Sequence, residues 1–154
     1  MAKKVKSKSG DVFKIPLLNG EVCYGQVLDF MMPNIIRIAL FEGTYGANEL
    51  IDPNQVVRLK AYSRIATDKH FINAGEWPII GNVEILIPIS SFPNEEFRKD
   101  DWVGAVHYSA TLVESFVNAY YGLKAWDMYY EPNYLDKFLV NPNEKPNNVI
   151  YEKL

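Results

Sequence analysis

The first apolar pattern of the chain predicts a β-hairpin over residues 10–28, where two apolar runs flank the pair Asn19-Gly20. Asn-Gly is typical of a type I′ turn, in which both central residues need a positive φ. Alternation places Phe13, Ile15 and Leu17 on one face of the first strand, and Val22, Tyr24, Gln26 and Leu28 on one face of the second. Cys23, Gly25 and Val27 face the other way, and a glycine within a strand indicates a bend or a close backbone approach. We expect a small, strongly curled β-barrel to begin here.

Later apolar runs predict further strands in four places: 35–41, 55–59, 83–89 and 149–151. Residues 62–67 fit either a strand or a short helix, and residues 134–140 fit either a helical turn or a strand. The glycines and prolines of residues 70–81 indicate a long surface connection, while the polar residues 91–101 indicate a loop or a short helical turn.

One stretch has the spacing of an amphipathic helix, which we place at residues 109–123. Its apolar positions recur every three or four residues, at Leu112, Phe116, Ala119 and Tyr120. Ser109 is suited to the N-terminal cap and Gly122 to the C-terminal end. This helix is expected to pack on the strands.

The predicted fold class is therefore α+β, mainly antiparallel β, with an SH3-like or similarly curled partial barrel and one main helix packed near residues 109–123. A chain of 154 residues forms one domain and buries about 70% of its unfolded surface. We expect a basic, flexible leader at residues 1–9 and a single globular domain over residues 10–154.

Charge limits the kinds of partner. The formal net charge is −3, and because four lysines lie within residues 1–9 with no acid among them, the rest of the chain carries −7. An acidic body disfavours a nucleic-acid partner, which a basic face would normally bind. It suits a basic protein partner instead, because opposite charges speed association. The sequence leaves the oligomeric state open.

No motif in the sequence predicts catalysis, a cofactor or a metal. Cys23 is the single cysteine, which excludes an internal disulfide framework and indicates a buried structural thiol. His70 and His107 lack the spacing of metal ligands, so we expect structural or solvated roles for both. The sequence has neither a phosphate loop nor a nucleophile elbow, and it lacks an apolar run of membrane-spanning length. With no secretory signal pattern either, the default location is the cytoplasm.

The best candidate for a partner-binding site is an acidic cluster beside a large aromatic residue: Glu95, Glu96, Asp100, Asp101 and Trp102. A charge run of this kind is usually a solvated face. The functional interpretation is an interface in which Trp102 forms the desolvated centre and the carboxylates meet Arg or Lys of the partner. Arg98 and Lys99 dilute the acidic charge. Trp77, Trp126 and the pair Tyr129-Tyr130 are further candidates.

The opening hairpin also resembles the start of the bacterial immunity protein 26 family. The resemblance rests on a Gly-Asp-x-Phe-x-Ile-Pro start and an aromatic-Gly-x-Val strand, matched here by Gly10, Asp11, Phe13, Ile15, Pro16, Tyr24, Gly25 and Val27. Weaker similarity follows at residues 77–81 and 134–139. The resemblance implies a non-catalytic protein that is encoded beside a polymorphic secreted toxin and neutralises that toxin by binding it. It implies no particular binding residues, because the matched motif looks like scaffold.

Two alternatives remain open from the sequence. A start of this kind is also similar to growth-inhibiting ribonuclease toxins with an SH3-like fold, which use an Arg or Lys, a Thr or Ser and an acid near the sheet. Arg37 and Arg58, both expected on strands, and Thr44 are the residues that such an enzyme would use here. The third possibility is a generic β-barrel interaction module.

Overall fold

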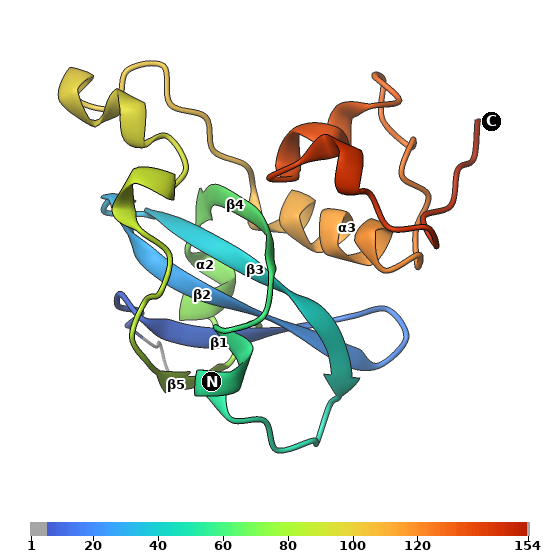
Figure 1. The fold of residues 1–154 in the computed structure, drawn as a ribbon, viewed down its shortest axis with the longest axis horizontal. Helices are drawn as coiled ribbons and strands as arrows, with labels where there is room; N and C mark the ends of the chain where they lie inside the picture. Colours follow the sequence, from blue (N-terminus) through green and yellow to red (C-terminus); the bar gives the residue numbers. More distant parts are fainter. Residues whose placement is uncertain (1–5, 154) are drawn as a thin grey trace.

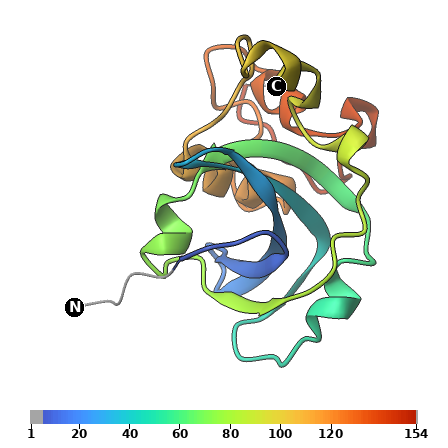
Figure 2. The same ribbon diagram turned by 90° about the vertical axis from the view of Figure 1, so that its left-hand side faces the viewer.

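Five antiparallel strands form one strongly curled sheet in the computed structural model, which describes residues 6–153 (Figure 1). The strands are β1 (Asp11–Pro16), β2 (Glu21–Met32), β3 (Ile35–Gly46), β4 (Ala61–Asp68) and β5 (Ile79–Asn82). Their order is β4-β3-β2-β1-β5, so β4 and β5 are the edges and the sheet does not close. Seen along the strands, the sheet bends round like part of a barrel (Figure 2). The predicted α+β class and the partial barrel are confirmed.

Short helices connect and follow the strands. They are α1 (Pro53–Val56), α2 (His70–Asn73), α3 (Ala110–Tyr120) and the 3-10 turns η1 (Ile89–Ser91), η2 (Glu95–Asp100), η3 (Tyr134–Phe138) and η4 (Pro142–Glu144). The predicted main helix is confirmed as α3. The Ser109 side chain accepts a hydrogen bond from the amide of Leu112 at 3.2 Å, and Gly122 follows the helix with φ +77°.

The opening hairpin is confirmed, but its predicted turn type is wrong. The amide of Gly20 donates to the carbonyl of Leu17 at 3.1 Å, and the amide of Leu17 donates to the carbonyl of Glu21 at 2.8 Å. Only Gly20 of the turn has a positive φ, of 87°, so the loop is a three-residue turn with a glycine bulge. Asn19 keeps a negative φ because its Oδ1 accepts the amide of Glu21 at 3.0 Å.

The two faces of the sheet carry separate apolar layers. On the first face, Phe13, Ile15 and Ile38 pack with Val113 and Phe116 of α3, together with residues of the C-terminal segment. The second face carries a smaller layer covered by α1 and by residues 83–92: Val12, Val22, Tyr24, Leu28, Ala39, Phe41, Val56, Val57 and Phe92. The sheet is thus enclosed on both sides, and each face depends on segments that follow it in the chain.

Three strand predictions are wrong. Residues 55–59 lie in α1 and the turn after it, because Asp52 caps the amide of Asn54 at 2.9 Å and Pro53 begins the helix. Residues 83–88 make a single ladder hydrogen bond, from the amide of Val83 to the carbonyl of Gly10, and lead into η1. Residues 149–151 contribute a single bridge, between Ile150 and Ala125.

Other open expectations are now resolved. Residues 62–67 belong to β4, and residues 134–138 form η3. The expected connection at residues 70–81 contains α2 and the start of β5. Residues 1–5 of the expected leader lie outside the described residues. Of the rest, Ser7 is buried and the amide of Lys8 donates to Asp11 Oδ2 at 2.8 Å.

The close approach at Gly25 gives a direct test of this packing. A Cβ atom there would lie 2.7 Å from Cζ of Phe13 and 2.8 Å from the carbonyl oxygen of Ala39. We expect Gly25→Ala to lower the free energy of unfolding by about 2 kcal/mol, because overpacking forces the strands apart. Urea unfolding measures this.

Gly46→Ala is the matched control, because a Cβ at Gly46 would meet only the Glu49 side chain, at 3.8 Å. We expect this change to alter the free energy of unfolding by less than about 0.5 kcal/mol. Equal effects of the two substitutions would contradict the packing described for β1, β2 and β3.

Candidate functional site

A fully buried arginine lies at the base of the candidate site. Arg37 of β3 faces Asp29 of β2, and its Nε and Nη2 donate to the two oxygens of that carboxylate at 2.6 and 2.5 Å. Its Nη1 donates to the carbonyl of Pro93 at 3.0 Å and to Glu95 Oε1 at 2.9 Å. The guanidinium therefore ties the start of η2 to the sheet.

Two aromatic rings enclose this guanidinium. The Cζ atom of Arg37 lies 5.0 Å from the ring centroids of both Phe92 and Trp102. Arg98 also lies 5.0 Å from the Trp102 ring, while its Nε donates to Glu95 Oε2 at 2.7 Å. Cation–π attraction strengthens when the cation is desolvated, as it is for Arg37. We refer to the following residues as the Arg37 cluster: Asp29, Arg37, Phe92, Glu95, Arg98 and Trp102.

The ion pairs set the charge states within the cluster. Hydrogen bonds from Arg98, and next from Arg37, lower the pKa of Glu95 to about 2, although partial burial opposes the change. Desolvation by itself would lower the pKa of Arg37. The hydrogen bonds and charges of Asp29 and Glu95 outweigh it and raise that pKa. Glu95 and Arg37 are therefore both charged near neutral pH.

The backbone beside the cluster is strained. Asp101 and Trp102 have φ values of 54° and 68°, and such a conformation is an outlier for a bulky residue such as Trp. The amide of Trp102 donates to the carbonyl of Phe97 at 2.8 Å, and its carbonyl accepts the amide of Ala105 at 3.0 Å. Strain of this kind costs about 1–3 kcal/mol per residue and is concentrated at functional sites.

The strained residues belong to a protruding segment, residues 89–104, which extends away from the sheet (Figure 1, yellow). Of the carboxylates predicted for partner binding, Glu96, Asp100 and Asp101 are exposed, whereas Glu95 is held in the Arg37 cluster. Trp102 is half-buried over Arg37. The protruding segment also exposes apolar side chains, with Ile89 61% and Val103 74% exposed.

Sequence reasoning missed the role of Arg37 and Asp29 in this site. The available signal was a single arginine within the apolar run of residues 35–41, with an aspartate at the end of the preceding apolar run. A buried arginine requires a carboxylate partner. The sequence contained no indication that Glu95, 58 residues further along, completes the pair.

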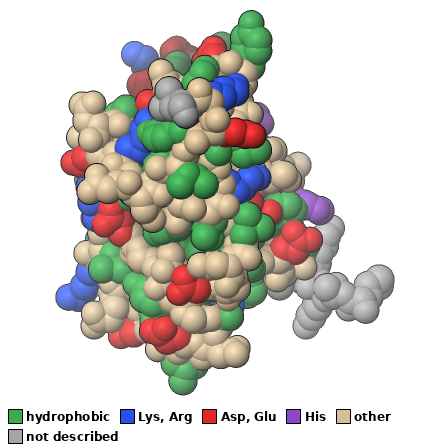
Figure 3. Space-filling view, turned by 90° about the vertical axis from the view of Figure 1, so that its right-hand side faces the viewer, with side chains coloured by type: hydrophobic (Ala, Val, Ile, Leu, Met, Phe, Trp, Pro, Cys, Tyr) green, Lys and Arg blue, Asp and Glu red, His purple; other side chains and the backbone are tan. Residues whose placement is uncertain are grey.

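The other sequence candidates are mostly core residues. Trp77 and Trp126 are fully buried, and their indole nitrogens donate to Glu114 and Asp136 at 3.1 and 2.7 Å. Tyr130 is fully exposed. Cys23 is buried as predicted, and burial raises the pKa of its thiol. On the side of the molecule drawn in Figure 3, side chains of both charges are scattered among apolar ones, without a large patch of one sign.

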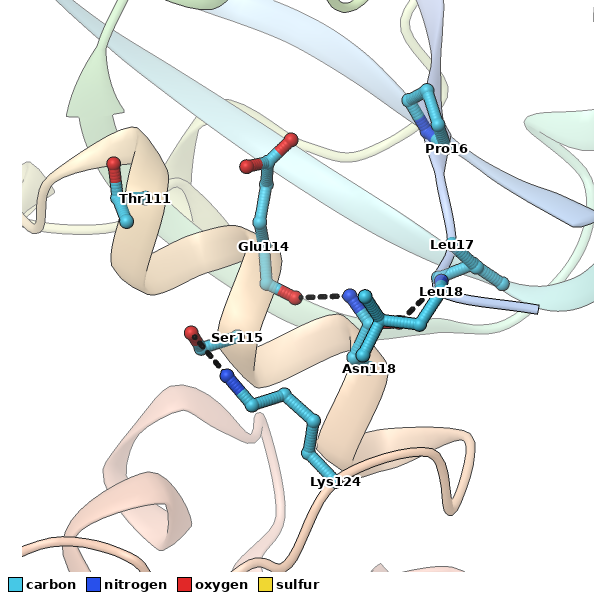
Figure 4. A pocket seen from close by; sticks show the side chains of 8 residues that line it. All are labelled: Pro16, Leu17, Leu18, Thr111, Glu114, Ser115, Asn118 and Lys124. Atoms are coloured by element: carbon cyan, nitrogen blue, oxygen red, sulfur yellow. Dashed lines mark hydrogen bonds between the residues drawn. The ribbon is translucent and has the colours of Figure 1, made fainter. Parts of the chain in front are cut away.

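An open groove lies between the hairpin loop and α3 (Figure 4). Its polar groups bind one another. The amide of Leu18 donates to Asn118 Oδ1 at 2.9 Å, Asn118 Nδ2 donates to the carbonyl of Glu114 at 2.8 Å, and Lys124 donates to Ser115 at 3.2 Å. The groove thus fastens the hairpin to α3, and we assign no ligand to it.

The residues that a ribonuclease toxin would use are not assembled. Arg37 is occupied by two carboxylates, and Thr44 lies seven residues further along β3, roughly 23 Å away at the rise of a strand. Arg58 was expected on a strand, but it lies in the turn after α1.

Within residues 6–153, no three His, Cys, Asp or Glu side chains gather as a metal site. The same residues form no helix with the length and apolar character needed to cross a bilayer.

The fold is thus that of a small α+β protein built on an open, curled antiparallel sheet. The family model described as Immunity protein 26 matches residues 8–102, and the chain belongs to that family, as the hairpin motif predicted. No curated protein and no solved structure matches the chain. The family match covers all five strands and most of the protruding segment, and it ends at Trp102, before α3.

The acid sensitivity of folding tests the Glu95 ion pairs. The folded-state pKa of about 2 lies below the ordinary value of about 4.3. The stabilisation from Glu95 is therefore complete above that ordinary value and is lost as the pH falls through 2. We expect the difference in unfolding free energy between wild type and Glu95→Gln to shrink between about pH 4.5 and pH 2 in urea titrations.

Glu96→Gln serves as the control, because Glu96 is the exposed neighbour and has no ion pair within residues 6–153. Its difference from wild type should not shrink in this way. A Glu95→Gln difference that stays constant over the whole pH range would disprove the ion pairing.

Proposed function

We propose that this protein is a non-catalytic immunity protein that binds a cognate secreted toxin and blocks it, by covering the active site or an adjacent surface. Membership of the immunity protein 26 family supports this function in general terms. The proposal places the protein in the cytoplasm of the producing bacterium, where a single thiol such as Cys23 stays reduced.

We further propose that the protruding segment is the toxin-binding surface. The observation that carries this assignment is the strained pair Asp101-Trp102, which is held in place over the buried Arg37. A fold retains such strain where the fixed geometry is useful. The exposed Val103 beside this pair supplies an apolar contact, and Asp100 and Asp101 surround it with charge.

Charge favours a basic toxin surface. Residues 95–102 carry four carboxylates against two basic side chains, and Arg98 is engaged with Glu95. Exposed carboxylates on a projecting segment attract a basic partner before contact and raise the association rate. Trp102 is less available to a partner than the sequence suggests, because part of its ring already covers Arg37. The carboxylates are therefore better probes of binding than Trp102.

The test uses the toxin domain encoded beside this gene. Wild type should bind it and restore growth of cells that express it. In Asp100→Asn/Asp101→Asn, we expect the association rate to fall about tenfold at low salt, with little change in the dissociation rate. The deficit should nearly vanish near 1 M salt, where the screening length is about 3 Å. Stopped-flow kinetics measures both rates.

The matched control is Glu76→Gln/Glu131→Gln, which removes the same charge from exposed carboxylates outside the protruding segment. Equal slowing by both double variants would assign the steering to overall charge rather than to this segment. If wild type neither binds the toxin domain nor restores growth, the proposed function is wrong.

A further inference from the structure

An unusual stretch of chain, residues 83–88, connects β5 to the protruding segment; we call it the crossing segment. It runs from the edge strand β5 to η1 beside the curled sheet (Figure 2). Its side chains alternate as in a strand. Val83, Ile85 and Ile87 pack against the apolar layer of the second face, while Glu84 and Leu86 are exposed. The segment therefore has the side-chain pattern of a strand.

The crossing segment lacks the backbone partners of a strand. The amide of Val83 donates to the carbonyl of Gly10 at 3.1 Å, which is the last ladder contact. Within residues 6–153, the amides of residues 84–87 and the carbonyls of residues 85–87 make no hydrogen bond to the protein. A row of unpaired donors and acceptors on an extended chain is a template for another strand.

A buried side chain fastens the start of this segment to β2. Gln26 of β2 is fully buried, and its Nε2 donates to the carbonyls of Gly10 and Val83 at 3.3 and 3.1 Å. The carbonyls of Val83 and Glu84 are thus bound by a side chain of β2 and not by a neighbouring strand. Gln26 and the packing of Ile85 and Ile87 hold this segment on the second face before any partner binds, which lowers the entropy cost of binding.

We propose that the crossing segment binds an extended strand of the toxin domain, which pairs with the backbone of residues 84–87. This inference rests on the proposed function and specifies how the toxin is held. Backbone pairing provides affinity in such strand addition, and pockets for alternate side chains provide specificity. Leu86 and Ile89 are 51% and 61% exposed along the same edge and offer apolar contacts. Pro88 has no amide hydrogen and ends the row.

Charge on and beside the crossing segment favours the toxin over a second copy of this chain. The crossing segment leads directly into the protruding segment with its exposed Asp100 and Asp101, so one partner can reach both surfaces. Glu84 adds a further carboxylate on the outer side. Two copies that paired here would bring like charges together, whereas a strand flanked by Lys or Arg would complement them.

Amide hydrogen exchange tests the proposal on the intact protein. In the free protein, the amides of residues 84–87 should exchange fast. In the complex with the toxin domain encoded beside this gene, the amides of Glu84 and Leu86, which lie on the edge opposite the bound amide of Val83, should exchange at least about tenfold more slowly. If the complex forms and these amides still exchange fast, strand pairing is wrong while the proposed function stands. Failure to form any complex defeats the proposed function instead.

A second copy as the occupant gives a different result. Protection of the same amides in the free protein that increases with its concentration would identify self-association, and would overturn the choice of the toxin.

A backbone substitution gives an independent test. Leu86→Pro removes an amide that has no partner in the free protein, whereas Leu86→Ala removes the side chain and keeps the amide. Both variants should retain the wild-type melting temperature. We expect Leu86→Pro to weaken toxin binding about tenfold more than Leu86→Ala does. Equal affinities of two folded variants would overturn the strand pairing. If Leu86→Pro does not fold, the exchange measurement decides.

Discussion

The arrangement of the candidate site depends on the ion pairs of the buried Arg37. Its guanidinium is fully buried, so it must be paired, and the fold supplies Asp29 from the neighbouring strand and Glu95 from η2. Because Glu95 and Pro93 both bind Arg37, the protruding segment is anchored at its base. Trp102 packs over the same guanidinium in a strained conformation. One buried charge thus positions an exposed surface.

The remainder of the fold provides a rigid support for that surface. Gly25 allows β1, β2 and β3 to approach closely, and the curled sheet carries an apolar layer on each face. The first face is covered by α3, which lies beyond the part of the chain that matches the family model. Residues outside the matched region therefore complete the core of the matched sheet. The second face is covered by α1 and the crossing segment, which lie within the match.

Local patterns were enough to predict the hairpin, the helix α3 and the buried thiol, because each depends on residues close together in sequence. The strand predicted at 83–89 shows that such patterns do not predict backbone pairing. Its side chains do alternate, but beyond Val83 its amides find no strand partner, and Gln26 of a distant strand binds the carbonyls of Val83 and Glu84. The acidic cluster was located from composition, whereas the engagement of Glu95 by Arg37 joins positions 58 residues apart. Local periodicity carries no information about such long-range pairing.

We propose that the Arg37 cluster holds the toxin-binding surface in place. The most direct measurement is the footprint of the neighbouring toxin domain on the isotope-labelled protein, followed by backbone amide chemical shifts. We expect the large shift changes to fall within residues 84–104 and the groove between the hairpin loop and α3 to stay unaffected. Large changes confined to that groove, or to the exposed aromatic residues 129–134, would contradict it.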